Sequence, residues 1–110
     1  VAPIDGEDVI FKALPNSFAG TALKGRLKEI ARRDLIIVGF QTHMCVSATT
    51  RAALDMGYKN TLIADAIATR DLPGAAGGPD IPAADIHNAT LAALADRFAI
   101  VVQSVSDIPD

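Results

Sequence analysis

The sequence predicts an α/β fold in which a central parallel sheet lies between two layers of helices. Two observations indicate this class. Short apolar runs rich in β-branched residues recur along the 110 residues, and helical patterns lie between them. The run at residues 35–40 is continuously apolar, as expected of a strand covered on both faces. Because no repeat or linker divides the chain, residues 1–110 are interpreted as a single domain with right-handed crossovers.

The N-terminal third contains one predicted strand and one predicted helix. Residues 8–12 form a short apolar run that ends in the polar Lys12 and predicts a buried strand. A loop with proline and glycine follows, and Thr21 is suited to cap a helix that runs to about residue 33. The apolar stripe of this helix is formed by Leu23, Leu27 and Ile30.

Two further strand–helix pairs complete the predicted pattern. After the strand at 35–40, a helix is expected over residues 43–56, with Gly57 ending it, and a buried strand over 61–65. A loop rich in glycine and proline spans residues 72–80. The last helix opens at Ile81 and Pro82, and the last strand covers residues 99–103. The helix stripe comprises His87, Leu91, Leu94 and Phe98.

Composition excludes several classes of function. A net charge of −3, with acidic and basic residues interspersed, gives no reason to expect nucleic-acid binding. No apolar run is long enough to span a membrane. A single cysteine rules out an internal disulfide and suits a reducing compartment, so we expect a cytoplasmic protein. No spacing of ligand residues indicates a metal site, and no cofactor is predicted.

The cysteine is the first candidate for chemistry. In a parallel sheet the carboxyl ends of the strands share one edge, which would hold Lys12, Cys45 and Asp65. The predicted helix begins beside Cys45, and both a helix N-terminus and a nearby ammonium favour the thiolate form. These features favour a nucleophile over the alternative of a small buried packing residue.

Other interpretations of these residues remain open. Cys45 and Arg51 fit the C-x5-R pattern of cysteine phosphatases, but the intervening residues lack the glycines of a phosphate loop, and on a helix Arg51 would not face Cys45. A Cys–His pair with His43 is the other chemical option, whereas His87 fits a core or interface position better. Asp65 is either a site carboxylate or, more simply, the cap of a loop.

The segment GFQTHMCV at residues 39–46 resembles the G-x-x-T-x-x-C-V segment of the isochorismatase-like cysteine hydrolases, a family that includes nicotinamidases and N-carbamoylsarcosine amidohydrolases. Lys12, followed by Asn16-Ser-Phe18, resembles the catalytic-lysine segment of that family. Gly57-Tyr58 and Asp65-Ala66 agree with the pattern downstream. The resemblance covers nearly the whole chain and implies an enzyme with an α/β fold.

The resemblance also implies roles for individual residues. The family uses an Asp–Lys–Cys triad, so Cys45 would attack a substrate carbonyl and form a thioester with loss of ammonia or an amine. Lys12 would favour the thiolate. The backbone N–H groups of Gln41 and Cys45 would form the oxyanion hole, after a cis peptide bond between Phe40 and Gln41. Phe18, Phe40 and Gln41 are the candidate substrate-binding residues.

The predicted function is therefore cleavage of a C–N bond in a small amide or carbamoyl substrate, without cofactor or metal. The family's catalytic Asp ends an N-terminal strand ahead of the lysine, and neither Asp5 nor Asp8 follows such a run. Family members are nearly twice as long, so we expect this chain to lack that strand and its helix and to be inactive or nearly so alone. An exposed sheet edge would then favour a homo-oligomer. The alternative is a non-catalytic assembly domain of the same fold.

Overall fold

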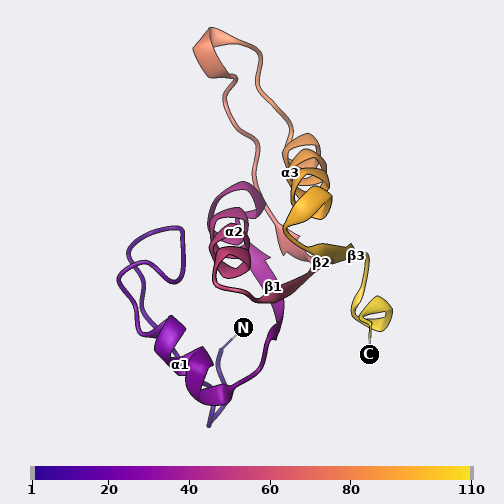
Figure 1. Ribbon diagram of the computed structural model, residues 1–110. Helices are drawn as coiled ribbons and strands as arrows, with labels where there is room; N and C mark the ends of the chain where they lie inside the picture. The colour runs from indigo at the N-terminus through magenta and orange to yellow at the C-terminus, as the bar shows by residue number, and fades with distance from the viewer. Residues whose placement is uncertain (1, 110) are drawn as a thin grey trace.

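The computed structural model describes residues 2–109 and has three parallel strands, with helices between them in sequence (Figure 1). The strands are β1 (Asp34–Phe40), β2 (Lys59–Ala68) and β3 (Ile100–Val102), hydrogen-bonded in the order β1-β2-β3. The helices are α1 (Leu23–Ile30), α2 (Ser47–Asp55) and α3 (Ala83–Arg97). Short helical turns occur at Thr42–Val46, Ala75–Gly77 and Val105–Asp107. The predicted parallel α/β class is confirmed.

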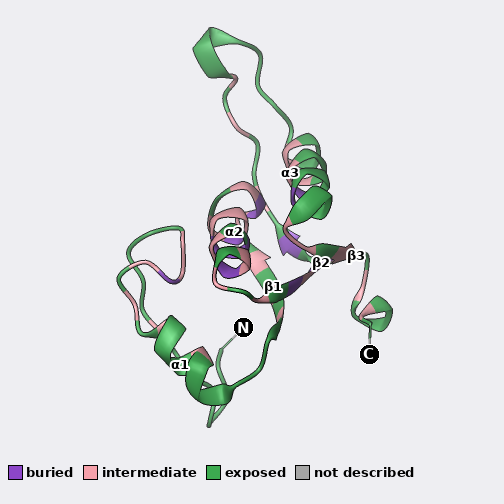
Figure 2. Ribbon diagram, in the orientation of Figure 1, coloured by how far each residue is buried: buried purple, intermediate pink, exposed green. Residues whose placement is uncertain are grey.

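The hydrophobic core lies between the sheet and the pair α2 and α3. Figure 2 shows buried segments concentrated on α2, on β2 and on the side of α3 that faces them. The core cluster consists of Val46, Leu62, Ile67, Leu91 and Leu94. Burying a leucine side chain contributes about 1.5–3 kcal/mol, so the fully buried Leu62 and Leu94 anchor β2 and α3 to each other.

Strand β1 is covered on one face only, which corrects the prediction of a strand buried on both sides. Its residues alternate between exposed and half-buried along the strand. Ile37 packs against the core cluster, whereas Ile36, Val38 and Phe40 are 55%, 51% and 74% exposed. The reason is that α2 and α3 pack on the Ile37 face, and no helix of residues 2–109 covers the opposite face. β1 is also an edge strand, paired with β2 alone.

The predicted first strand, at residues 8–12, is wrong. This segment has no strand hydrogen bonds, and Phe11 within it is 91% exposed. A strand needs a neighbour to satisfy its backbone N–H and C=O groups, and the part of the chain that the structure describes places none beside it. An ion pair between Asp8 and Arg26 of α1 connects the segment to the rest of the structure.

The first two helices differ from their predicted bounds for local reasons. α1 stops at Ile30 rather than near residue 33, because Ala31 adopts a left-handed conformation with φ of 59°. The Thr21 hydroxyl accepts the Leu23 N–H at 3.3 Å, although Ala22 holds the N-cap position. The second helix starts with the wide turn Thr42–Val46 before α2 becomes regular, and Gly57, with φ of +90°, follows its end as predicted.

The remaining elements follow the prediction with changed lengths. β2 runs beyond the predicted 61–65, because Gly39 and Phe40 of β1 pair with its last residues after an irregularity in register. The loop between β2 and α3 projects from the body of the molecule (Figure 1), and an antiparallel bridge between Leu72 and Ile81 closes it. The Asp71 carboxylate accepts the Ala83 N–H at the start of α3. Within residues 2–109, no helix has the length and apolar character needed to cross a membrane.

Candidate active site

Lys12 and Cys45, which are 33 residues apart, lie in direct contact. The Lys12 Nζ is 3.2 Å from the Cys45 Sγ. The same ammonium donates to the backbone carbonyls of Leu14 at 3.1 Å and Pro15 at 3.5 Å. These carbonyls hold the head of an exposed lysine beside the thiol, so the charge is oriented although the side chain is not enclosed.

Cys45 is positioned by the connection between β1 and α2. The peptide bond between Phe40 and Gln41 is cis. The N–H groups on either side of Cys45, those of Met44 and Val46, both donate to the Gln41 carbonyl, at 3.0 and 3.2 Å. Cys45 is half-buried in this wide turn. It therefore precedes the regular helix α2 by two residues, which corrects its predicted place in the first α-helical turn.

The loop that carries Lys12 is attached to α2 through Thr49, a residue the sequence reasoning missed. The Thr49 hydroxyl accepts the Ser17 N–H at 2.9 Å and also contacts the Ser17 hydroxyl at 3.0 Å and the Pro15 carbonyl at 3.4 Å. Thr49 lies one turn after Cys45, so one helical face presents both the thiol and the anchor of the lysine loop. The sequence signal that could have identified Thr49 is a hydroxyl residue within an alanine-rich helix.

The three candidate substrate-binding residues have different surroundings. Phe18 is buried and stacks on Tyr58, with ring centroids 6.5 Å apart, so its ring serves packing. Phe40 is exposed on the open face of β1. The Gln41 side-chain oxygen is buried without a hydrogen-bond partner among the described residues. Leaving such an acceptor unpaired costs about 1–3 kcal/mol, so Gln41 holds an unused acceptor close to Cys45 in sequence.

Within residues 2–109, neither histidine is hydrogen-bonded to the thiol. The His43 Nδ1 is 2.8 Å from the Thr69 hydroxyl, and the His87 Nδ1 is 2.8 Å from the buried Thr42 hydroxyl. The second contact ties α3 to the turn that contains Cys45, in agreement with a structural role for His87. Among the hydrogen bonds of the described residues, the partner of Cys45 is Lys12 and no Cys–His pair is formed.

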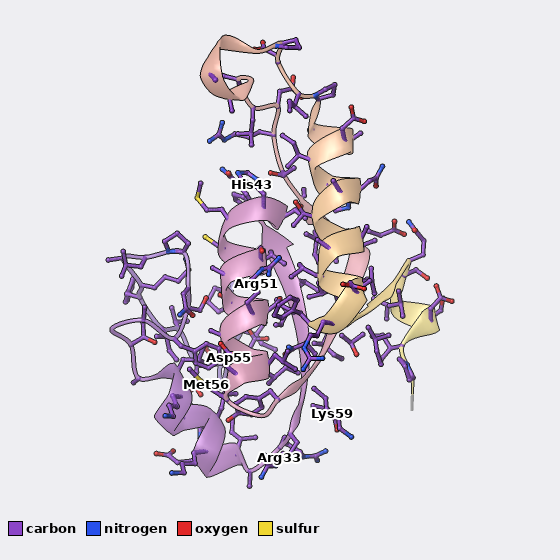
Figure 3. The ribbon with its side chains drawn as sticks, turned by 45° about the horizontal axis from the view of Figure 1, so that its top comes forward. Arg33, His43, Arg51, Asp55, Met56 and Lys59 are labelled. Carbon is purple, nitrogen blue, oxygen red and sulfur yellow. The ribbon has the colours of Figure 1, made fainter. Side chains whose placement is uncertain are left out.

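The phosphatase interpretation is excluded by the position of Arg51. This residue is helical in α2, and its guanidinium lies over the Phe98 ring at 4.4 Å, with its Nε donating to the Ser47 hydroxyl. No loop around a phosphate is formed. Figure 3 shows Arg51 midway along α2, away from the labelled His43 at the start of the same helical segment.

Asp65 lies within the sheet, where its hydrogen bonds have a structural role. It lies inside β2 rather than at its end, its backbone N–H donates to the Gln103 carbonyl at 3.0 Å, and its carboxylate accepts the Gln103 side-chain amide at 2.5 Å. These bonds extend the pairing of β2 beyond the end of β3. The predicted position of Asp65 at the end of its strand is therefore wrong, and its partner is Gln103 rather than the thiol.

A cavity adjoins Lys12, but no carboxylate of residues 2–109 is hydrogen-bonded to Lys12 or Cys45. A cavity of about 410 Å³ extends from Lys12 toward α1, and its polar lining also includes Asp8, Ser17 and Arg26. Asp8 is ion-paired with Arg26, which raises the pKa of that guanidinium. Within residues 2–109 no carboxylate hydrogen-bonds to Lys12 or Cys45, and no group of three or more His, Cys, Asp or Glu residues could hold a metal.

Comparisons with known proteins place the sequence and the fold of this chain within one family. The family model described as Isochorismatase domain matches residues 1–106. The uncharacterized isochorismatase family protein YddQ of Bacillus subtilis (strain 168) is 40% identical over 101 residues, which are 92% of this chain and 55% of YddQ. An isochorismatase structure from Pseudomonas putida KT2440 has a TM-score of 0.91 and 47% identity, covering 97% of this chain and 54% of that one.

A nicotinamidase structure from Staphylococcus aureus is more distant, with a TM-score of 0.72 and 30% identity over 87% of this chain and 53% of that one. The chain thus spans about half the length of the proteins it matches. The matched region includes the cysteine, the lysine and the parallel strands that carry this site. The chain belongs to the isochorismatase family.

Proposed function

We propose that this chain supplies the nucleophile and its cationic partner to a hydrolase that cleaves a C–N bond in a small amide or carbamoyl compound. The observation that carries the proposal is the contact of 3.2 Å between the Lys12 Nζ and the Cys45 Sγ. An ammonium in contact with sulfur stabilises the thiolate, which is the nucleophilic form of cysteine. The relatives support a hydrolase, and the nicotinamidase supports an amide as the scissile group.

The proposed reaction has two stages. In the first, the Cys45 sulfur adds to the substrate carbonyl carbon, the C–N bond breaks, and the nitrogen takes a proton and leaves as ammonia or an amine. In the second, water adds to the thioester carbonyl, gives up a proton, and the C–S bond breaks to release the acid and restore the thiolate. Lys12 compensates the negative charge on sulfur at the beginning and end of the cycle.

Backbone N–H groups are the proposed oxyanion donors. The Gln41 N–H makes no hydrogen bond to another described residue, and the N–H of Cys45 lies on the nucleophile itself. One such donor contributes about 3 kcal/mol to lowering the barrier of an acyl transfer. The free side-chain oxygen of Gln41 supports a substrate-binding role, because an amide or carbamoyl substrate carries N–H donors. Phe40 remains a candidate for the apolar boundary of the substrate site, whereas the Phe18 ring is buried against Tyr58.

The attack by sulfur requires the nucleophile and its cationic partner, whereas protonation of the leaving nitrogen and activation of water require a further acid–base group. The test separates these two requirements. The described contacts of Cys45 and Lys12 include no carboxylate that would transfer the proton to nitrogen or activate water. We therefore expect the chain to react with an acyl donor whose leaving group needs no proton. An activated ester such as p-nitrophenyl acetate meets this condition. Nicotinamide, in contrast, should be turned over slowly by this chain or left intact.

The experiment is single-turnover acetylation followed by p-nitrophenol release and by mass spectrometry of the intact chain and its peptides. Acetyl transfer to Cys45 in the unmodified protein, its loss in Cys45→Ser, and slower transfer in Lys12→Met support the proposal. Acetylation spread over lysines, with equal p-nitrophenol release from Cys45→Ser, would refute it. Circular dichroism of each variant verifies that the fold is retained.

A non-catalytic assembly domain is the second candidate. The exposed residues Ile36, Val38 and Phe40 favour it, because they form an apolar sheet face that the described helices leave open. In that case the thiol would react with the ester no faster than free cysteine under the same conditions. The rate relative to free cysteine therefore separates the two candidates.

A further inference from the structure

A second cavity, of about 370 Å³, lies between α1 and the turn that joins α2 to β2. Its lining is dominated by cationic side chains on one side and by Met56 and Tyr58 on the other. The cationic residues are Lys24, Lys28, Arg32 and Arg33. All four come from the short segment 24–33, and the structure gathers their charges around one cavity.

These positive charges are not neutralised by neighbouring carboxylates. No acidic residue lines the cavity. Among residues 2–109 the ion pairs within 4.0 Å are those of Arg26 with Asp8 and Glu29. Asp34 and Asp55 adjoin the cavity in sequence but neither lines it nor pairs with its cations. A concentration of four cations on a chain with a net charge of −3 creates a local field that attracts anions.

The course of the backbone brings these four side chains to one cavity. Lys24 and Lys28 lie one turn apart on the same face of α1, where like charges repel each other by about 0.2–0.5 kcal/mol. The left-handed Ala31 then ends the helix, and Arg32 and Arg33 follow it to the start of β1. A Cβ at Gly57 would lie only 3.2 Å from the Arg33 Nη1, so the guanidinium packs against a glycine.

The cavity lies away from the thiol, although Leu27 of α1 lines both this cavity and the one beside Lys12. Arg33 and Tyr58 lie just before the first residues of β1 and β2, whereas Cys45 follows the last residue of β1. Figure 3 shows Arg33 and Met56 at one end of the molecule and His43, next to the thiol turn, at the other end of α2. The function proposed for Cys45 therefore does not account for these four cations.

We propose that this cavity binds a small ligand through a triphosphate group. Two guanidinium forks and two ammonium groups match a chain of phosphate oxygens better than a single carboxylate, because each arginine can bind two oxygens of one phosphate. The volume falls in the range of small-molecule sites. The aliphatic and aromatic lining provided by Leu27, Met56 and Tyr58 suits an uncharged group attached to the phosphates.

Isothermal titration calorimetry with two probes tests the proposal: inorganic tripolyphosphate and adenosine triphosphate, each without added metal. Saturable binding that weakens at least severalfold between about 0.05 M and about 0.3 M salt is expected. Equal affinities for the two probes would show that the phosphate chain alone is recognised. Tighter binding of adenosine triphosphate would show that the apolar lining also contributes. Absence of saturable binding of both probes at the lower salt concentration would overturn the proposal.

Matched variants locate the site. Lys24→Gln combined with Lys28→Gln should weaken binding roughly tenfold or more, since hydrogen bonds to charged groups are lost. Both positions are exposed on α1, so the fold is retained, and relief of the repulsion should raise the midpoint of thermal unfolding slightly. The control variant, Arg70→Gln with Arg97→Gln, removes the same charge elsewhere. Equal loss of affinity in the control would contradict a specific site.

Discussion

Replacing Lys12 by methionine should slow alkylation of Cys45. The substitution keeps an unbranched side chain of similar length and removes the ammonium that lies 3.2 Å from the sulfur. Because Lys12 is exposed and Cys45 only half-buried, the attraction is screened as in water. Two unit charges at this separation attract by about 1.3 kcal/mol in water, and about 1.4 kcal/mol corresponds to a factor of ten in an equilibrium. Losing this attraction should slow the reaction of the negatively charged sulfur roughly five- to tenfold.

The assay is the second-order rate of iodoacetamide labelling near pH 6, followed by mass spectrometry. Alkylation proceeds through the negatively charged sulfur, so its rate reports the stabilisation that the neighbouring ammonium provides. Lys24→Met is the matched control, because it removes an exposed lysine that does not contact the thiol. Cys45→Ser gives the background. Equal rates for Lys12→Met and the unmodified chain, both folded, would refute the electrostatic reasoning.

Three further predictions concern stability and association. Leu94→Ala should lower the free energy of unfolding by about 2–5 kcal/mol in denaturant titrations, since Leu94 is fully buried, whereas exposed Leu14→Ala should change it little. Gly57→Ala should cost about 1 kcal/mol or more because of its φ of +90° and the Arg33 guanidinium beside it, while Gly25→Ala within α1 should stabilise by about 0.5–1 kcal/mol. Val38→Lys should reduce self-association measured by sedimentation velocity, because Val38 lies exposed on the open face of the edge strand β1.

Each of these predictions has a clear contrary outcome. Equal destabilisation by Leu94→Ala and Leu14→Ala would place the core elsewhere. A neutral Gly57→Ala would show that the turn after α2 tolerates a side chain. Sedimentation that does not depend on concentration in the unmodified chain would contradict the predicted homo-oligomer, whatever the effect of Val38→Lys.

The predicted meeting of Lys12 and Cys45 came from an argument that the structure only partly supports. Both residues were placed at the carboxyl edge of a parallel sheet, yet residues 8–12 form no strand. The contact is made instead by the loop after Lys12, which the Thr49 hydroxyl attaches to α2. A single hydroxyl that joins two distant segments leaves almost no periodic pattern in the sequence. The sequence could therefore predict that Lys12 and Cys45 are neighbours, but not that Thr49 holds the lysine loop in place.

The sequence by itself determined the parallel α/β class, the strand before the cysteine, the helix after it and the glycine that ends that helix. These features depend on hydrophobic periodicity and on backbone preferences, which act over a few residues. The apolar run at β1 also predicted a strand correctly, but not which of its faces is covered, because coverage depends on helices that return from elsewhere in the chain.

Only the tertiary structure decided which side chains meet. It paired Asp65 with Gln103, placed Arg51 over Phe98, and left the Gln41 side-chain oxygen without a partner. It also placed the charges of four basic residues from the segment 24–33 around one cavity. The physical reason is that these contacts join residues far apart in the sequence, and their approach depends on how the helices and strands pack. For the basic residues, the left-handed Ala31 ends α1 and redirects the chain at Arg32 and Arg33.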